Sequence, residues 1–311
     1  MEQYTLREIY LRWKDAKRML VKESTLATYM IHAEKYILPA MGDNRRITAG
    51  DVQALAFSML GRRLSGRTVR SVLVVLKMIG TYGRRIGWDG WAGSSPLLPR
   101  DVVVPGVSVL TCDEQRRLMH YLRANFSTRN LGIYISLCTG MRIGEICGLR
   151  WSDIDIAAGL LHVRRTVERI YVPDGVRRYT KLTVGDPKTA ASRRDIPITP
   201  ALMSMLAPAG ELMAADSYLL TGTPHPLEPR LLRRHYVLLM RRLGLPELKF
   251  HALRHTFATR CIESDCDFKT VSVLLGHSSV STTLNLYVHP GLGQKQRCID
   301  RMMQSVMDRL T

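Results

Sequence analysis

A stretch without hydrophobic periodicity divides the chain, and this division limits most strongly the folds that the chain can adopt. Residues 91–108 contain Trp-Ala-Gly-Ser-Ser-Pro followed by Pro99 and Pro105. Dense Gly and Pro without periodicity is typical of a linker. With 311 residues, the chain is long enough for a domain on each side. The predicted parts are a first domain over 1–95, a linker over 96–108, a second domain over 109–294 and a C-terminal helix over 295–311.

The first domain is predicted to be an all-α bundle. Thr5 and Glu8 have the spacing of a capping box, and apolar residues keep helical spacing from there to about Val21. Further helices are expected over 23–38, ending at Pro39, over 48–60, and from Ser65 onward. Arginines gather where the last of these helices begins, and the candidates for contact with a phosphate or a DNA groove are Arg67 and Arg70. The alternative is a solvated, charged helix end.

The second domain is predicted to be mainly helical with one β segment. Helices are expected from Thr111 to Arg123 and over 130–137, and the apolar period changes to two between 160 and 198. The turn signal Asp174–Gly175 lies inside this segment. The expected strands are 161–167, 179–184 and 192–198. The fold class is therefore mainly α with a small antiparallel β-sheet.

The charge of the chain favours a polyanionic partner. The formal net charge is +18, and residues 1–100 hold 17 Lys and Arg against 8 Asp and Glu, or +9, so both parts are basic. Nucleic acid is the first expectation, and a charge that serves only solubility is the alternative. No apolar run approaches the length of a membrane span, and no secretory signal opens the chain. We therefore expect a cytoplasmic, nucleoid-associated protein without a membrane partner.

Four side chains suited to one reaction lie between residues 251 and 287. His251 and Arg254 are three residues apart, so they share a face if this segment is helical. His277 follows an apolar run, and Tyr287 comes ten residues later. A phenol, with a pKa of about 10, is a weak nucleophile at neutral pH and needs a base or cations nearby. These groups would allow a tyrosine hydroxyl to attack a phosphate.

Two further residues would complete such a site. Negative charge grows on the phosphate oxygens during the attack, and arginine binds two oxygens without losing its proton. Arg142 would therefore form a clamp with Arg254. Lys188, in the tight connection between two predicted strands, would protonate the leaving oxygen. His251 would handle the tyrosine proton, and His277 would hydrogen-bond the phosphate. No DxD or HxH pattern is present, so no metal and no cofactor are predicted.

These residues lie in segments that resemble the motifs of the tyrosine recombinases, the phage integrase family. Thr139-Gly140-Met141-Arg142-Ile143-Gly144-Glu145 is similar to the first arginine box. Pro187-Lys188-Thr189, followed by Ser192-Arg193-Arg194, is similar to the lysine hairpin. His251-Ala252-Leu253-Arg254 resembles the HxxR box, and Leu275-Gly276-His277 with Tyr287 resembles the histidine box and nucleophile. The order and spacing also fit. The resemblance is strong over 109–311, whereas 1–90 match only in kind, as the helical, SAM-like domain that binds core sites.

The resemblance implies a site-specific DNA recombinase. Such an enzyme forms a 3′-phosphotyrosyl link, here at Tyr287, and exchanges strands through a Holliday junction without ATP or metal. Glu145 would order the arginine box. The two domains would form a C-shaped clamp on double-stranded DNA that carries short inverted core sites, and four protomers would assemble. The C-terminal helix would dock on a neighbouring protomer.

Several alternatives stay open. A type IB-like DNA topoisomerase uses similar groups, and a non-catalytic DNA-binding protein would also be basic. Within the family, integration or excision of a mobile element, inversion and resolution are all open, and the extended hairpin favours the mobile element. Arg230 and Arg233 are candidate DNA contacts. His255 is next to the HxxR pair in the sequence, but its side chain is expected to point elsewhere on the helix and to be structural. The last helix has an apolar stripe that docks in trans or folds back on its own domain: Ile299, Met302, Met303, Val306, Met307 and Leu310.

Overall fold

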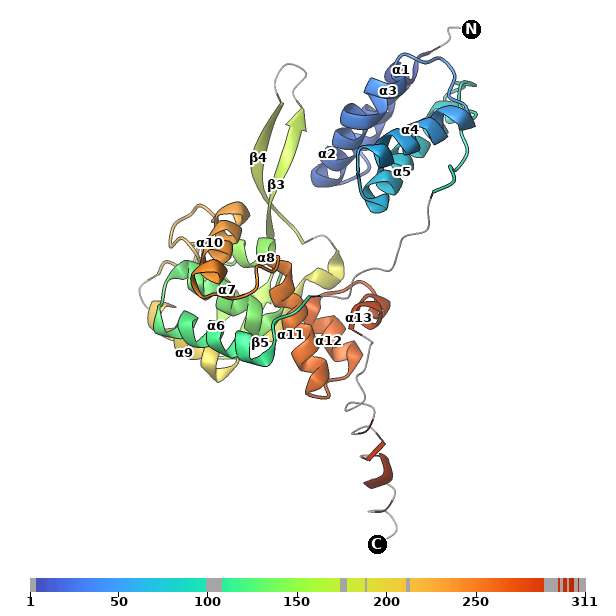
Figure 1. Ribbon diagram of the computed structural model, residues 1–311. Coiled ribbons are helices and arrows are strands. Elements are labelled where there is room, and N and C mark those ends of the chain that lie inside the picture. Colours follow the sequence, from blue (N-terminus) through green and yellow to red (C-terminus); the bar gives the residue numbers. More distant parts are fainter. Residues whose placement is uncertain are drawn as a thin grey trace. The chain divides into compact units, whose positions relative to one another are not determined.

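The chain divides into two compact units (Figure 1). The computed structural model describes residues 4–98, 108–173, 178–187, 189–210 and 213–287, with positions 296, 299, 300, 302–304 and 307. One unit comprises Met1–Val104 together with Ile170–Lys181, and the other comprises Pro105–Arg169 and Leu182–Thr311. The domain boundaries expected above stay predictions. The grouping of Ile170–Lys181 with the first unit is a feature that the sequence did not predict.

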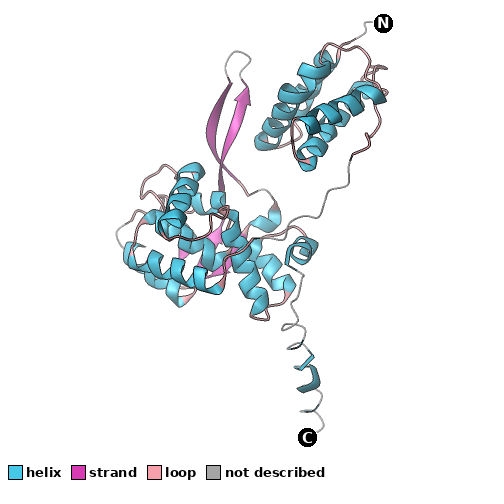
Figure 2. Ribbon diagram, viewed as in Figure 1, coloured by secondary structure: helices cyan, strands magenta, loops and turns pink. Residues whose placement is uncertain are grey.

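The first unit is a bundle of helices (Figure 2). Its elements are α1 (Leu6–Arg18), α2 (Glu23–His32), α3 (Leu38–Met41), α4 (Ala49–Gly61) and α5 (Gly66–Arg85). The predicted capping box is present at Thr5, whose hydroxyl accepts the backbone N–H of Glu8 while the Glu8 carboxylate accepts that of Thr5. Thr48 caps α4 in the same way through Asp51. The apolar faces of α1, α4 and α5 meet in one core.

The sequence predicted that the second helix ends at Pro39, and this prediction is wrong. The chain passes from α2 through a π-helical turn, Ala33–Ile37, into α3, which has Pro39 in its first turn. Proline has no N–H and its ring clashes with the carbonyl of the residue four positions earlier, here Lys35. The wider π-helical turn before Pro39 relieves this steric clash, so the chain continues in a helical path.

The second unit is built around a helix that is buried on all sides. This helix, α7 (Thr128–Thr139), has every described residue from Asn130 to Leu137 buried, as expected of a central helix. The helices that contact it are α6 (Cys112–Ala124), α8 (Ile143–Cys147), α9 (Pro200–Gly210), α10 (Pro229–Arg242) and α11 (His251–Glu263). The last two helices, α12 (Phe268–Leu275) and α13 (Val280–Tyr287), pack against α11 and against each other. In the described part of the chain, no helix is both long and apolar enough to cross a membrane.

The β segment forms two sheets instead of the single one predicted. The first is antiparallel, in the order β1 (Ile154–Asp155), β2 (Leu160–Val163) and β5 (Arg194–Pro197), with Leu161 opposite Ile196. The second pairs β3 (Thr166–Pro173) with β4 (Arg178–Gly185). The predicted strand 161–167 is interrupted between Val163 and Thr166, where Arg165 pairs with the buried carboxylate of Asp153. The expected turn at Asp174–Gly175 lies outside the described residues.

Candidate active site

The first arginine box lies where the central helix ends. Gly140 follows α7 in the left-handed region, with φ of 65°. A Cβ atom at Gly140 would lie 2.5 Å from Cδ1 of Phe257 and 2.7 Å from Cδ2 of Leu275, so only glycine fits here. The carbonyl of Gly140 points to the HxxR helix and accepts a 2.8 Å hydrogen bond from Nη1 of Arg254. The turn thus joins two predicted catalytic segments through the backbone.

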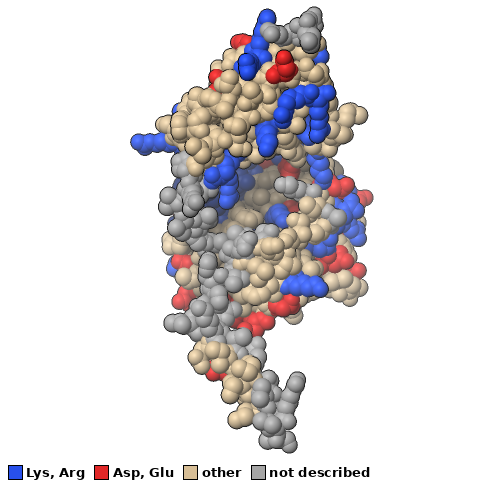
Figure 3. Space-filling view, turned by 90° about the vertical axis from the view of Figure 1, so that its right-hand side faces the viewer, with Lys and Arg blue, Asp and Glu red and all other residues tan. Residues whose placement is uncertain are grey.

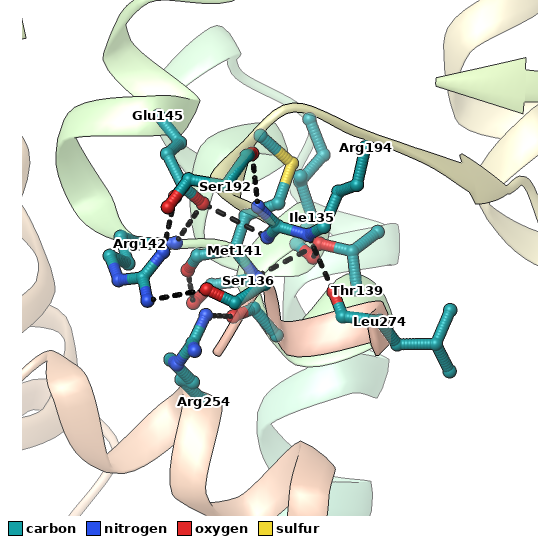
Figure 4. Close-up of polar contacts among 12 residues, drawn as sticks. Ile135, Ser136, Thr139, Met141, Arg142, Glu145, Ser192, Arg194, Arg254 and Leu274 are labelled. Atoms are coloured by element: carbon teal, nitrogen blue, oxygen red, sulfur yellow. Dashed lines mark hydrogen bonds and ion pairs between the residues drawn. The ribbon is translucent and has the colours of Figure 1, made fainter. Parts of the chain in front are cut away.

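Glu145 holds Arg142 in a fixed orientation (Figure 4). Its side chain is 1% exposed, and its carboxylate accepts Nη1 of Arg142 at 2.7 Å and the backbone N–H of Arg142 at 2.9 Å. The remaining terminal nitrogen, Nη2 of Arg142, donates to the carbonyl of Gly276 at 3.2 Å. About a third of the Arg142 side chain stays exposed, 36%, so the guanidinium keeps an open side for an anion. The hydrogen-bonding role expected of Glu145 is therefore present.

The HxxR pair lies at the beginning of α11. Arg254 is almost fully buried, at 2% exposed, on the side of α11 that packs against α7. His251 is the first residue of α11, and its ring lies edge-on to that of His255, with centroids 4.6 Å apart. His255 is thus a direct neighbour of the pair. The expectation that its side chain points elsewhere is wrong, because residues four apart lie on one face of a helix.

The two candidate histidines are neutral at physiological pH. Although His251 as a whole remains exposed, partial desolvation of its ring and then the nearby His255 and Arg254 lower its pKa to about 4. Burial, followed by the charges of Arg254 and Arg142, lowers the pKa of His277 to about 4 as well. A neutral imidazole can accept a proton or donate one hydrogen bond, which are the uses that the sequence predicted for these two residues.

A second glycine turn positions His277. Gly276 ends α12 in the left-handed region, with φ of 64°, and the backbone N–H of His277 donates to the carbonyl of Ser272 at 3.0 Å. Nδ1 of His277 lies 2.9 Å from Oγ1 of the buried Thr283 in α13. This contact fixes the ring and leaves Nε2 available for a ligand. His277 is therefore held from α12 and α13 together.

Some of the predicted site residues cannot be placed. Lys188 lies outside the described residues, and for Tyr287 the structure gives the position at the end of α13 but not the side chain. Their expected roles stay predictions. In the C-terminal segment, Val306 and Leu310 lie outside the described residues. The other members of the apolar stripe are exposed: Ile299, Met302, Met303 and Met307.

The candidate DNA contacts lie on exposed faces. Arg67 is exposed in the first turn of α5, and Arg70 is half-buried one turn later. Arg230 and Arg233 are exposed on α10, whose apolar residues are buried. On the face shown in Figure 3, Lys and Arg side chains are frequent over the first unit, in the upper part of the view, where few acidic side chains lie among them. The positions are compatible with DNA contact, which stays a prediction.

Two residues of the site have contacts that the sequence analysis did not predict, although Arg194 lies in the segment that resembles the lysine hairpin. Arg194 contacts Glu145, and Thr283 contacts His277. Arg194 had a sequence signal, because it alternates with Ile196 on the buried face of β5, where a charged residue is unusual. Thr283 had none, since its partner lies across a turn. In the described part of the chain, no cluster of three or more His, Cys, Asp or Glu could hold a metal ion.

The family of this chain follows from its match to known proteins. A family model described as phage integrase family matches residues 108–292, which is more than half of the chain. The chain belongs to the phage integrase family. This integrase family member is 28% identical to the tyrosine recombinase XerC-like protein of Caldanaerobacter subterraneus subsp. tengcongensis, over 96% of this chain and 82% of that protein. The resemblance noted in the four motifs is confirmed, and the match gives no support to the topoisomerase alternative.

Solved structures confirm the fold of this integrase family member. The Tn1549 transposon integrase, in complex with transposon right end DNA, matches with a TM-score of 0.71 and 21% identity, over 96% of this chain and 100% of that chain. A lambda integrase tetramer bound to a Holliday junction matches with a TM-score of 0.68 and 20% identity, over 91% and 77%. At identities this low, the structural matches show a common fold, which is mainly helical with small antiparallel sheets.

Proposed function

We propose that this tyrosine recombinase cleaves and rejoins DNA at specific sites through a 3′-phosphotyrosyl intermediate on Tyr287. One observation carries the proposal: Arg142 and Arg254 are both tied to the backbone of the turns that carry the other site residues. Arg254 binds the carbonyl of Gly140, and Arg142 binds that of Gly276. Two guanidinium groups held in place before the substrate arrives can stabilise charge that develops on a phosphate.

The proposed reaction begins with attack of the Tyr287 oxygen on the scissile phosphorus. His251, neutral at physiological pH, accepts the phenolic proton. Arg142 and Arg254 bind the non-bridging oxygens, whose charge rises in the transition state. His277 accepts the hydroxyl of Thr283 at Nδ1 and donates from Nε2 to the same phosphate. Lys188 protonates the 5′ oxygen as it leaves, so the bond energy is kept in the phosphotyrosine.

The same proposal extends to assembly and biological role. A 5′ hydroxyl from a partner duplex would attack the phosphotyrosine, and exchange would pass through a Holliday junction in a tetramer on short inverted core sites. The C-terminal helix would dock on a neighbouring protomer, and its exposed apolar stripe supports this arrangement. The two domains would clamp the duplex. The likeness to a transposon integrase supports a role in moving a mobile element, and such a role implies a cytoplasmic, nucleoid-associated protein.

A nicked suicide substrate tests the proposal. Duplexes built from inverted repeats beside the gene would carry a nick close to the cleavage point. Cleavage then releases a short fragment with a free 5′ hydroxyl, which diffuses away and cannot rejoin, so the covalent complex accumulates. Wild-type protein should become linked to a 3′ DNA end at Tyr287, as read by mass spectrometry of the peptide. Tyr287→Phe should bind the duplex equally well without linking. A covalent complex that persists in Tyr287→Phe, or a link to a 5′ end, would refute the mechanism.

A further inference from the structure

The buried guanidinium of Arg194 joins three segments of the site (Figure 4). Its side chain is 4% exposed, and each of its nitrogens has a partner on a different segment or turn. Nε donates to the carbonyl of Leu274 at 2.6 Å, Nη1 to that of Ser192 at 3.0 Å, and Nη2 to Oε2 of Glu145 at 3.0 Å. The first of these contacts holds the last turn of α12, directly before Gly276 and His277.

Glu145 is shared between two arginines. Oε1 binds the exposed-side arginine, Arg142, whereas Oε2 binds Arg194 and the backbone N–H of Arg142. Burial alone would raise the pKa of Glu145, but the charge and hydrogen bond of Arg194, followed by the charge of Arg142, hold it below its usual value. An ionised Glu145 is what orients Arg142, so Arg194 affects Arg142 without touching it.

Space around Gly276 shows how closely the same arginine approaches the histidine turn. A Cβ atom at Gly276 would lie 2.9 Å from Nη1 of Arg194 and 3.0 Å from the carbonyl of Ala191. Because Gly276 also accepts the bond from Arg142, a movement of Arg194 would displace both the arginine box and His277. The three segments are therefore positioned as one body.

We propose that Arg194 is a positioning residue for strand cleavage. It fixes the orientation of Arg142 through Glu145, and the position of His277 through the carbonyl of Leu274. Arg194 hydrogen-bonds neither Arg142 nor His277, the two phosphate-binding groups that it positions, but binds Glu145 and the carbonyl groups of Leu274 and Ser192. It provides the second positive charge that allows a buried carboxylate to stay ionised, and its three donors fix the distance between the arginine box and the histidine turn. This inference rests on the proposed function and adds a residue to it.

Single-turnover cleavage of the suicide substrate tests this role. Arg194→Met should slow cleavage roughly a hundredfold, since a displacement of about 1 Å in a catalytic group costs that much. The acid limb of the rate should also move to higher pH, because Glu145 then holds its proton more strongly. Arg194→Lys keeps the charge but loses the fork, so it should be slow without the shift in pH. Arg241→Met, which removes an exposed arginine paired with Glu247, is the matched control and should cleave as the wild type.

A double variant separates positioning from a general effect on folding. In Arg194→Met/Glu145→Gln the buried carboxylate is gone, so the combined loss should be much smaller than the product of the two single losses. Losses that multiply, or a slow but pH-independent Arg194→Met, would show a merely structural role. If Arg194→Met does not fold, Arg194→Lys decides the matter, and cleavage at the wild-type rate by Arg194→Lys overturns the proposal.

The inference also has a readout that needs no cleavage. In DNA-free protein, the imidazole of His277 can be titrated by NMR, and Arg194→Met should change both its resonance position and its midpoint, whereas Arg241→Met should change neither. An unaltered His277 in folded Arg194→Met contradicts the inference even if no DNA is ever cleaved. Conversely, an altered His277 in a protein that never forms a covalent complex would contradict the proposed function alone.

Discussion

At the scale of single residues, the absence of a side chain at Gly140 allows α7 to end close to Phe257 and Leu275. Gly140→Ala should lower the free energy of unfolding by roughly 2–5 kcal/mol, because left-handed strain of about 1–2 kcal/mol adds to an overpacking cost of about 1–3 kcal/mol against Phe257 and Leu275. Gly159 has the same φ of 65° with no atom within 4 Å of the added Cβ. Chemical denaturation of both alanine variants separates the two terms, and equal losses would show that the close contacts are harmless.

The low pKa values of the histidines predict a pH dependence of stability. His251 and His277 titrate near pH 4 in the folded, DNA-free protein, against 6.5 for an ordinary histidine. Between these values the unfolded chain binds more protons than the folded chain, so stability should fall as the pH drops from about 6.5 to about 4. Thermal melts should therefore show a smaller decrease from pH 7 to pH 5 in His277→Asn than in the wild type. An identical decrease would mean that His277 is not desolvated in solution.

A contact between two side chains could be predicted only where the two residues lie close together in the sequence. The pairing of His251 with Arg254 follows from helical spacing, and the motif around Arg142 includes its own partner, Glu145, three residues later. Arg194 lies 49 positions from Glu145 and 80 from Leu274, and only the packing of β5 against α8 and α12 brings them together. No local pattern encodes such a contact. The local signs at Arg194 were its place in the segment that resembles the lysine hairpin and its alternation with Ile196 on the strand, and neither identifies its partners.

At the scale of elements, α10 offers a test of DNA contact. Its apolar residues are buried against the unit, whereas Arg230 and Arg233 are exposed. Arg230→Ala/Arg233→Ala should weaken DNA binding for all sequences, and the slope of log K against log salt should lose about 0.9 for each phosphate contact removed. Arg241→Ala is the control, since its guanidinium is held by Glu247 at 2.8 Å. An unchanged salt slope would identify the two arginines as a solvated surface.

Element ends were predictable where the chemistry is local, and pairings were not. The helix starts at Thr5, Thr48 and Thr111 each depend on a side chain three residues later, so the sequence contains the whole cap. The β segment divides at Arg165, which binds Asp153. The chain continues past Pro39 through a π-helical turn, which the spacing of apolar residues does not reveal. The first miss involves a contact between residues twelve positions apart, and the second a rare local helix geometry that hydrophobic periodicity does not signal.

At the scale of the whole molecule, the chain has separate hydrophobic cores. The core of the first unit and the largest core of the second share no residue. Calorimetry should therefore show two transitions. Thr48→Ala removes a cap worth about 1 kcal/mol and should lower one transition by roughly 4–8 °C, whereas Thr111→Ala should lower the other by roughly 2–4 °C. A single transition that both variants shift equally would show that the units unfold together.

The composition of the first unit has a consequence for building chimeric enzymes. That unit is discontinuous in the sequence, because Ile170–Lys181 belong to it although they are encoded inside the other unit. A fusion that exchanges only the residues before the linker would combine a foreign bundle with the native hairpin. Transplanting the unit intact requires three cuts in the gene, one at the linker and one on each side of Ile170–Lys181, within β3 and within β4. The natural boundary for modular exchange is thus spatial, and a single crossover point in the DNA cannot reproduce it.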